Sequence, residues 1–225
     1  MTGDARAEVL SRIRAALGAS PDAPPVPRDY RERGDHGPGS DALLDLLDEC
    51  LVDYRARVRR VSAAEVGAAV DSVLAGHGAR RVVLPPGLPD EWKPRRPGAG
   101  TRPAPGAGGP DPVELFVDDG MGTADLDQMD GVVTGCAVAI AETGTLVLDA
   151  SPDQGRRSLT LIPDLHVCVV TPERVVQTVP EAVARLEPTR PLTFISGPSA
   201  TSDIELDRVE GVHGPRRLEV LLVQA

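Results

Sequence analysis

Six short segments in the second half of the chain are almost continuously apolar. They are VELFV, GVVTGCAVAIA, TLVLDA, HVCVV, LTFIS and LEVLLV, which lie between residues 113 and 223. A strand with one solvated face alternates apolar and polar residues, whereas a strand covered on both faces has no need to alternate. These segments therefore predict buried strands in a sheet that is covered on both sides.

Helical patterns come before these strands. Apolar residues at helical spacing predict an amphipathic helix over residues 4–17, and Gly18 closes it. A second apolar stripe, which runs through Val58, predicts a helix over residues 41–60. Ser62 and Glu65 then have the spacing of a capping box, which predicts a third helix to about residue 74.

The first strand is then expected in RRVVLPPG, residues 80–87, and a further helix at residues 173–187. Helices before and between buried strands are typical of an α/β fold. We expect an open, mainly parallel sheet with helices on both faces.

The chain divides by composition into two parts. Residues 1–36 combine the first helix with a linker rich in proline, glycine and charge, and we expect this helix to dock on a partner. Residues 37–225 form the α/β domain, with a proline- and glycine-rich loop at residues 93–112. The 225 residues are enough for one domain with a core of its own and an appendage.

Charge and cysteine spacing exclude several classes of function. The formal net charge of −10 argues against nucleic acid or an anionic membrane as a partner. Cys50, Cys136 and Cys168 lie far apart and lack the spacing of a zinc, iron–sulfur or redox site, so we expect no metal in this chain. With no secretory signal and no apolar run of roughly 18–20 residues, a cytoplasmic protein without a membrane span is expected.

Four polar loops follow the apolar segments and contain the candidate site residues. A glutamate at a strand end lies where ligands of α/β sheets usually bind, adjacent arginines can hold a carboxylate, and a Gly-Ser-Thr loop that opens a short helix can bind an anion. A histidine between two glycines is unshielded. The residues are Glu142, Thr143, Gly144 and Thr145; Arg156 and Arg157; Gly197, Ser199, Thr201, Asp203 and Glu205; and His213 and Gly214.

Each loop also has a structural interpretation. Glu142 can cap a turn, His213 can be a surface histidine, and the arginines can pair with Asp153 and Asp164. Four such loops together favour a site, although neither a GxxxxGK[ST] nor a GxGxxG motif for nucleotides occurs.

The stretches AIAETGTLVLDASPDQGRRSLTLIPDLHVCVV, FISGPSATSDIELDRVEGVHGPRRLEVLLV and VLSRIRAALG resemble the lactate-utilization protein C family, which is built on the LUD domain. The resemblance implies a fold like that of CoA transferases and sugar-phosphate isomerases. It also implies membership of a three-protein system that oxidises L-lactate to pyruvate, in which the partner proteins carry the iron–sulfur clusters.

On this resemblance we expect an accessory subunit that binds an organic acid, with Arg156 or Arg157 and the Gly-Pro-Ser loop at the carboxylate. It binds no cofactor itself, and a homo-oligomer is compatible with the sequence. Two alternatives stay open. One is an acyl or CoA transferase in which Glu142, beside Gly144, is the carboxylate nucleophile, as in relatives with that fold. The other is a scaffold with a vestigial site.

Overall fold

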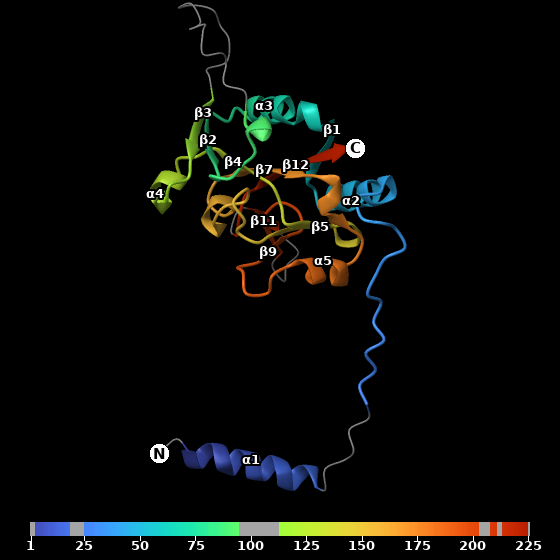
Figure 1. Cartoon of the computed structure of the whole chain (residues 1–225). Coiled ribbons are helices and arrows are strands. Elements are labelled where there is room, and N and C mark those ends of the chain that lie inside the picture. Colours follow the sequence, from blue (N-terminus) through green and yellow to red (C-terminus); the bar gives the residue numbers. More distant parts are fainter. Residues whose placement is uncertain (1–2, 19–24, 95–112, 203–207, 211–212, 225) are drawn as a thin grey trace, which may run out of the picture. The chain divides into compact units, whose positions relative to one another are not determined.

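The computed structural model describes residues 3–18, 25–94, 113–202, 208–210 and 213–224 (Figure 1). The chain divides into two compact units, Met1–Arg31 and Glu32–Ala225. In the first unit, helix α1 spans Gly3–Leu17, as expected, and four of its apolar side chains are exposed: Val9, Leu10, Ile13 and Leu17. Within the described ranges, no helix is both long and apolar enough to cross a lipid bilayer.

A six-stranded parallel sheet forms the centre of the second unit, in the order β1-β12-β7-β4-β2-β3. The strands are β1 (Arg57–Ser62), β12 (Arg217–Gln224), β7 (Leu165–Val170), β4 (Gly131–Thr134), β2 (Arg81–Leu84) and β3 (Glu114–Val117). The residues of β4 and β7 are buried throughout, which accounts for their continuously apolar sequences.

Helix α3 (Val66–Gly76) covers one face of this sheet. Its buried residues pack against those side chains of β7 that point to the same side, such as Val167 and Val169. The predicted capping box is present, since the Glu65 carboxylate accepts hydrogen bonds from the Ser62 backbone nitrogen (3.0 Å) and hydroxyl (2.6 Å).

The other face is covered by helix α2 (Asp41–Asp53) and by a second, four-stranded sheet. This sheet has the order β8-β5-β6-β9. Its strands are β8 (Val175–Val176), β5 (Val138–Ile140), β6 (Thr145–Leu148) and β9 (Thr193–Ile195). Ala139 and Leu146 join the core beneath the main sheet, whereas Val138 and Val147 point the other way toward helix α5 (Val179–Arg185). The second unit therefore has stacked layers, with α3 above the main sheet and α5 below it in Figure 1.

Helix α4 and a two-stranded sheet are smaller parts of the described fold. Helix α4 (Thr123–Leu126) precedes β4, and Leu126 packs against the main sheet on the side opposite α3. Strands β10 (Ala200–Ser202) and β11 (Arg208–Glu210) pair antiparallel. The predicted α/β class, an open parallel sheet flanked by helices, is confirmed.

The prediction of a helix through residue 60 is wrong. Helix α2 ends at Asp53, Arg55 has a left-handed backbone with φ of 68°, and Arg57–Ser62 is strand β1. As an edge strand, β1 is half-exposed and its arginines face solvent, so it lacks the continuous apolar pattern of the central strands. The first strand is thus β1 rather than residues 80–87.

Three other boundaries differ from the prediction. GVVTGCAVAIA divides into β4 and β5, and the helix expected at residues 173–187 is limited to α5, with β8 before it. At the division, a Cβ on Gly135 would lie 2.4 Å from the Asp153 Oδ2 atom, so the chain passes close to that carboxylate. The segment after Ser199 is strand β10 rather than the start of a short helix.

Candidate functional site

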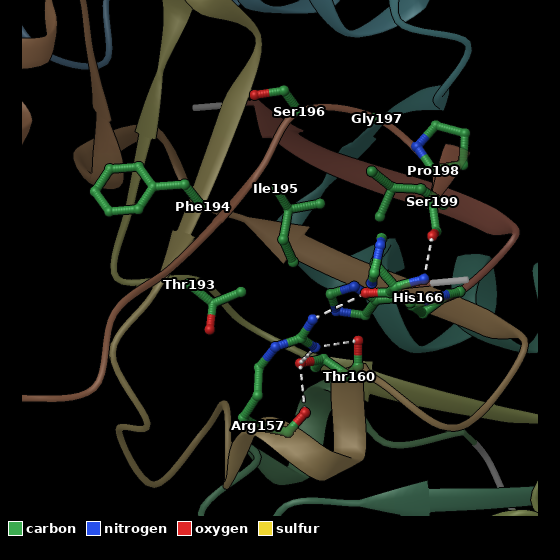
Figure 2. A pocket seen from close by; sticks show the side chains of 14 residues that line it. Arg157, Thr160, His166, Thr193, Phe194, Ile195, Ser196, Gly197, Pro198 and Ser199 are labelled. Carbon is green, nitrogen blue, oxygen red and sulfur yellow. Dashed lines mark hydrogen bonds between the residues drawn. The ribbon is translucent and has the colours of Figure 1, made fainter. Parts of the chain in front are cut away.

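A cavity of about 210 Å³ lies between the main sheet and residues 193–199. His166 and Leu218, each the second residue of its strand, line it from β7 and β12. The remaining walls come from Arg157 and Thr160, from residues 193–199, and from residues 213–215. In Figure 2, Arg157 and Thr160 lie on one side of the cavity and Ser196 to Ser199 on the opposite side.

The Arg157 guanidinium is fixed by oxygen acceptors alone. Its Nη1 donates to the Thr160 carbonyl (2.7 Å) and hydroxyl (3.2 Å), and its Nη2 donates to the His213 carbonyl (3.1 Å). Among the residues that the structure describes, no carboxylate lies within 4.0 Å of it. Burial lowers the pKa of Arg157 because the charge is partly removed from water. A desolvated cation without a counter-ion attracts an anion into the cavity.

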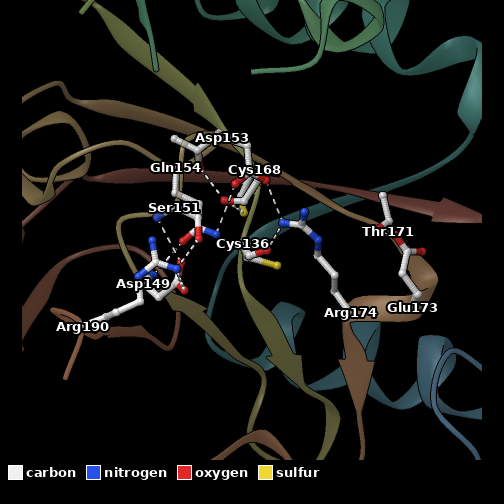
Figure 3. A network of polar contacts seen from close by, with 12 residues as sticks. Cys136, Asp149, Ser151, Asp153, Gln154, Cys168, Thr171, Glu173, Arg174 and Arg190 are labelled. Carbon is white, nitrogen blue, oxygen red and sulfur yellow. Dashed lines mark hydrogen bonds and ion pairs between the residues drawn. The ribbon is translucent and has the colours of Figure 1, made fainter. Parts of the chain in front are cut away.

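A turn at residues 149–154 sets the position of Arg157, because it leads directly into the 3-10 helix η4 (Arg157–Thr160). Two ion pairs hold this turn: Arg174 with Asp153 (2.7 Å) and Arg190 with Asp149 (2.8 Å). Figure 3 shows the two arginines reaching the turn from opposite sides. The turn is thereby joined to the segments on both sides of α5.

His166 is buried and neutral. It is 1% exposed, and its Nε2 lies 2.8 Å from the hydroxyl of Thr134 at the end of β4. Burial, with a smaller contribution from the positive charge of Arg157, lowers the pKa of His166 to about 4. The cavity therefore presents an uncharged imidazole beside a cation near pH 7.

The Gly-Pro-Ser loop forms the opposite wall. Gly197 has a φ of 88°, and a Cβ there would lie 2.4 Å from the Tyr54 carbonyl oxygen, so only glycine fits. The Ser199 hydroxyl accepts a hydrogen bond from the His213 backbone nitrogen (3.1 Å), and the Ser199 nitrogen donates to the Pro215 carbonyl (2.8 Å). These bonds join the two loops that the sequence singles out.

These cavity segments lie within residues 123–223, which match the model of the LUD domain. The lactate utilization protein C of Deinococcus radiodurans is 45% identical over 99% of this chain and 97% of its own length. The chain belongs to the lactate utilization protein C family. A further relative, the lactate utilization protein C of Bacillus subtilis, is 35% identical over 40% of this chain and 41% of its own length. The crystal structure of a DUF162 family protein from Deinococcus radiodurans superimposes with a TM-score of 0.63 at 40% identity, over 81% of this chain and 96% of that one.

In this member of the lactate utilization protein C family, the Glu-Thr-Gly-Thr segment is the turn of the β5–β6 hairpin. The Thr145 hydroxyl lies 2.8 Å from that of Thr143 and 2.8 Å from that of Ser196, which lines the cavity. The Glu142 carboxylate instead accepts a hydrogen bond from the Gln177 amide (3.0 Å) and is not a lining residue. The turn thus borders the site through its threonines, while its glutamate points to Gln177.

Arg156 lies outside the cavity wall. Its guanidinium makes two hydrogen bonds of 2.8 Å to the Asp118 carboxylate, and this pairing holds the pKa of Asp118 below its usual value. The alternative pairing of the Gln-Gly-Arg-Arg arginines with Asp153 and Asp164 does not occur, because these carboxylates pair with Arg174 and Arg216.

The other predicted residues divide between the cavity and elsewhere. Gly197, Ser199, His213 and Gly214 line the cavity. Gly144 has a φ of 54° and closes the hairpin turn. Thr201 belongs to β10, and Asp203 and Glu205 lie outside the described residues. In the described part of the chain, no group of three or more His, Cys, Asp or Glu residues has the arrangement of a metal site.

The sequence interpretation missed His166 and Thr134. The signal was a histidine within the apolar strand HVCVV, where a polar residue has to find a hydrogen-bond partner. The partner lies on another strand of the sheet, which the sequence does not identify.

Proposed function

We propose that this protein acts in lactate utilization as an accessory subunit that binds a small organic acid in the cavity beside Arg157. The observation that supports it most strongly is this guanidinium, which is partly desolvated and has only neutral partners among the described residues. A bound carboxylate would supply the missing counter-charge through two parallel hydrogen bonds.

Size and charge support a small anionic ligand. The cavity volume of about 210 Å³ is many times the roughly 10–15 Å³ that one water molecule needs. The Gly-Pro-Ser loop, with the Ser199 hydroxyl, lies across this space from the arginine. Because the chain has a net charge of −10, an organic anion needs such a local cation to bind.

The partners that we propose are proteins with iron–sulfur clusters, which would carry out the oxidation of L-lactate to pyruvate. This proposal rests on the family resemblance and on the spacing of Cys50, Cys136 and Cys168, which lack a cluster motif. The two relatives named above are called lactate utilization protein C, which supports a role of this chain in lactate utilization.

Acyl transfer by Glu142 gains less support. A carboxylate nucleophile has to reach the reacting carbonyl, whereas Glu142 is hydrogen bonded to Gln177 and is not part of the cavity wall. Trapping by hydroxylamine in the presence of a CoA thioester remains the test of this alternative.

Growth on L-lactate tests the proposed function. A strain that lacks this chain would be complemented by the wild type, Arg157→Gln, Arg156→Gln and Glu142→Gln. We expect Arg157→Gln alone to fail, because the other two residues lie outside the cavity wall. Thermal melting of each purified variant controls for folding. Full growth with Arg157→Gln would contradict the proposal, and failure with Glu142→Gln at unchanged stability would favour acyl transfer.

A pull-down tests whether the chain binds proteins with iron–sulfur clusters. The tagged wild-type chain, purified from the native cell under anaerobic conditions, should retain proteins with the visible absorption of iron–sulfur clusters. Purification without any cluster-bearing protein would contradict this part of the proposal.

A further inference from the structure

A second cavity, of about 430 Å³, lies at the amino ends of β1 and β12, which pair side by side in the main sheet. It adjoins the cavity beside Arg157 at Pro198 and Leu218, which line both. Its charged lining is its own, and we name it the arginine cavity for the four arginines in it. The ionisable residues that line it are Arg55, Arg57, Arg216, Arg217, His77 and Glu219.

Two of these arginines have a carboxylate beside them. The Nε atom of Arg216 lies 2.5 Å from the Asp164 carboxylate. Glu219 is 1% exposed, and its Oε1 atom lies 3.6 Å from Arg57 and 2.6 Å from the Nε2 atom of His77. This buried carboxylate therefore holds a cation and an imidazole together at the wall of the cavity.

The other two arginines have no carboxylate of their own. Arg217 reaches Asp164 only at 4.0 Å, and that carboxylate already pairs with Arg216. The side chain of Arg55 has no hydrogen bond or ion pair with any residue in the described part of the chain. Counting arginines and carboxylates alone, two positive charges of the cavity are unmatched. The whole chain is acidic, so this excess is local.

The backbone at Arg55 supports a function for its side chain. After helix α2 the Ala56 nitrogen donates to the Leu51 carbonyl and the Arg55 nitrogen to the Val52 carbonyl, which is a Schellman motif. Arg55 occupies the left-handed position of this motif, with φ of 68°, where glycine is the usual residue. Because arginine is strained there, the benefit of having it at this position lies in its side chain.

We propose that the arginine cavity is a second binding site, which takes the dianionic phosphate group of a small phosphate monoester. Such a group carries roughly 1.5 to 2 negative charges near pH 7, which matches the two unmatched arginines. Guanidinium groups also bind phosphate oxygens through paired hydrogen bonds. A monocarboxylate has one charge and leaves one arginine unmatched. The ligand of this site therefore differs from the organic acid proposed for the cavity beside Arg157.

Calorimetric titration of the full chain in chloride buffer at pH 7.5 tests the ligand class. The probes are phenyl phosphate, benzoate, which keeps the ring and has one charge, and inorganic phosphate. We expect saturable binding of phenyl phosphate, at least about tenfold tighter than that of benzoate and tighter than that of inorganic phosphate. No binding of phenyl phosphate, or equal binding of benzoate, would overturn the proposal. Equal binding of inorganic phosphate would overturn the assignment to a monoester.

Three variants test the position of the site. Arg55→Gln and Arg217→Gln each remove one unmatched charge, so each should weaken phenyl phosphate binding at least about fivefold. Arg14→Gln on the exposed face of α1 removes the same charge without touching the cavity wall, and its affinity should stay within about twofold of wild type. Equal losses in all three variants would show a general effect of net charge and would overturn the site. Thermal melting of each variant controls for folding.

A further pair of titrations separates this site from the proposed function. Arg157→Gln should bind phenyl phosphate within about twofold of wild type, and Arg55→Gln should keep the wild-type affinity for L-lactate. Loss of phenyl phosphate binding in Arg157→Gln, with full binding by Arg55→Gln and Arg217→Gln, would place this probe in the first cavity and overturn the inference. Failure of the wild type to bind L-lactate while phenyl phosphate binds would contradict the proposed function and support the second site.

Discussion

At the scale of single residues, two adjacent arginines have different functions. Arg156 pairs with Asp118, which lies 38 positions away in the sequence, whereas Arg157 turns into the cavity. The motif Gln-Gly-Arg-Arg predicted that arginine matters here, but not which of the two, because the position of Asp118 depends on the fold. His166 could not be predicted as a site residue for the same reason, since its partner Thr134 comes from a neighbouring strand.

Because the His166 imidazole is buried, we expect the stability of the folded chain to fall at acidic pH. The pKa of His166 is about 4 in the folded chain and about 6.5 when unfolded. Between these values the unfolded chain binds a proton that the folded chain excludes, so stability is full above about pH 6.5 and falls as the pH falls toward about 4. At roughly 1.4 kcal/mol per pKa unit, lowering the pH from 7.5 to 5 should cost the wild type roughly 2 kcal/mol through His166.

Urea unfolding of the wild type and His166→Phe at both pH values measures this contribution, because other groups titrate alike in the two proteins. The variant should lose roughly 2 kcal/mol less than the wild type. Equal losses would show that His166 is not held neutral.

At the scale of elements, the burial of a strand determines whether its sequence predicts it. The prediction of buried strands is confirmed for β7 and for the interior of β12, which are covered on both faces. It is wrong for β3 and β9, which are strands but lie at sheet edges and are only partly buried. Strand β1 was missed because it lies at the edge and pairs with β12, at the far end of the chain. Its two valines, Val58 and Val61, are three residues apart, a spacing that also fits a helix, so the sequence of this segment does not distinguish a strand from a helix. The pairing with β12 makes it a strand.

The close packing of the turn between β5 and β6 predicts that a methyl group added at Gly144 lowers the free energy of unfolding strongly. Gly144 and Gly78 both have left-handed backbones, with φ of 54° and 66°. A Cβ on Gly144 would lie 2.8 Å from the Cys50 carbonyl carbon in α2, whereas a Cβ on Gly78 has no atom within 4 Å. Gly78→Ala should cost about 1 kcal/mol of unfolding free energy, and Gly144→Ala about 2–4 kcal/mol.

Chemical denaturation of the two alanine variants measures the difference. The left-handed backbone is common to both, so the excess cost reports the packing of the turn on α2. Equal costs would show that α2 does not contact the turn as described.

At the scale of the whole molecule, we expect the first unit, Met1–Arg31, to be separable from the second, Glu32–Ala225. The apolar side chains of α1 are exposed, while Gly34 and His36 of the second unit pack on Gln177, with the His36 nitrogen donating to its side chain (3.0 Å). The composition places the division at residue 36 because the linker is rich in proline, glycine and charge, and a hydrogen bond from a backbone nitrogen leaves no mark in composition.

Two truncations test this division. Deletion of residues 1–31 should leave the unfolding free energy within about 0.5 kcal/mol, and deletion of residues 1–36 should cost about 1–2 kcal/mol more, because it removes the contacts with Gln177. Both should weaken the pull-down of partner proteins, which we expect α1 to support. A large loss of stability on deletion of residues 1–31 would show that α1 belongs to the core.

The proposed function depends on the binding of a small organic acid through its carboxylate to Arg157. Calorimetric titration of L-lactate into the purified full chain, the Arg157→Gln variant and the Arg156→Gln variant tests it most directly. We predict saturable binding to the wild type, a loss of at least about tenfold in Arg157→Gln, and binding within about twofold of wild type in Arg156→Gln despite a lower melting temperature. Failure of the wild type to bind L-lactate, or equal binding by Arg157→Gln, would contradict the role of Arg157 as the carboxylate-binding residue.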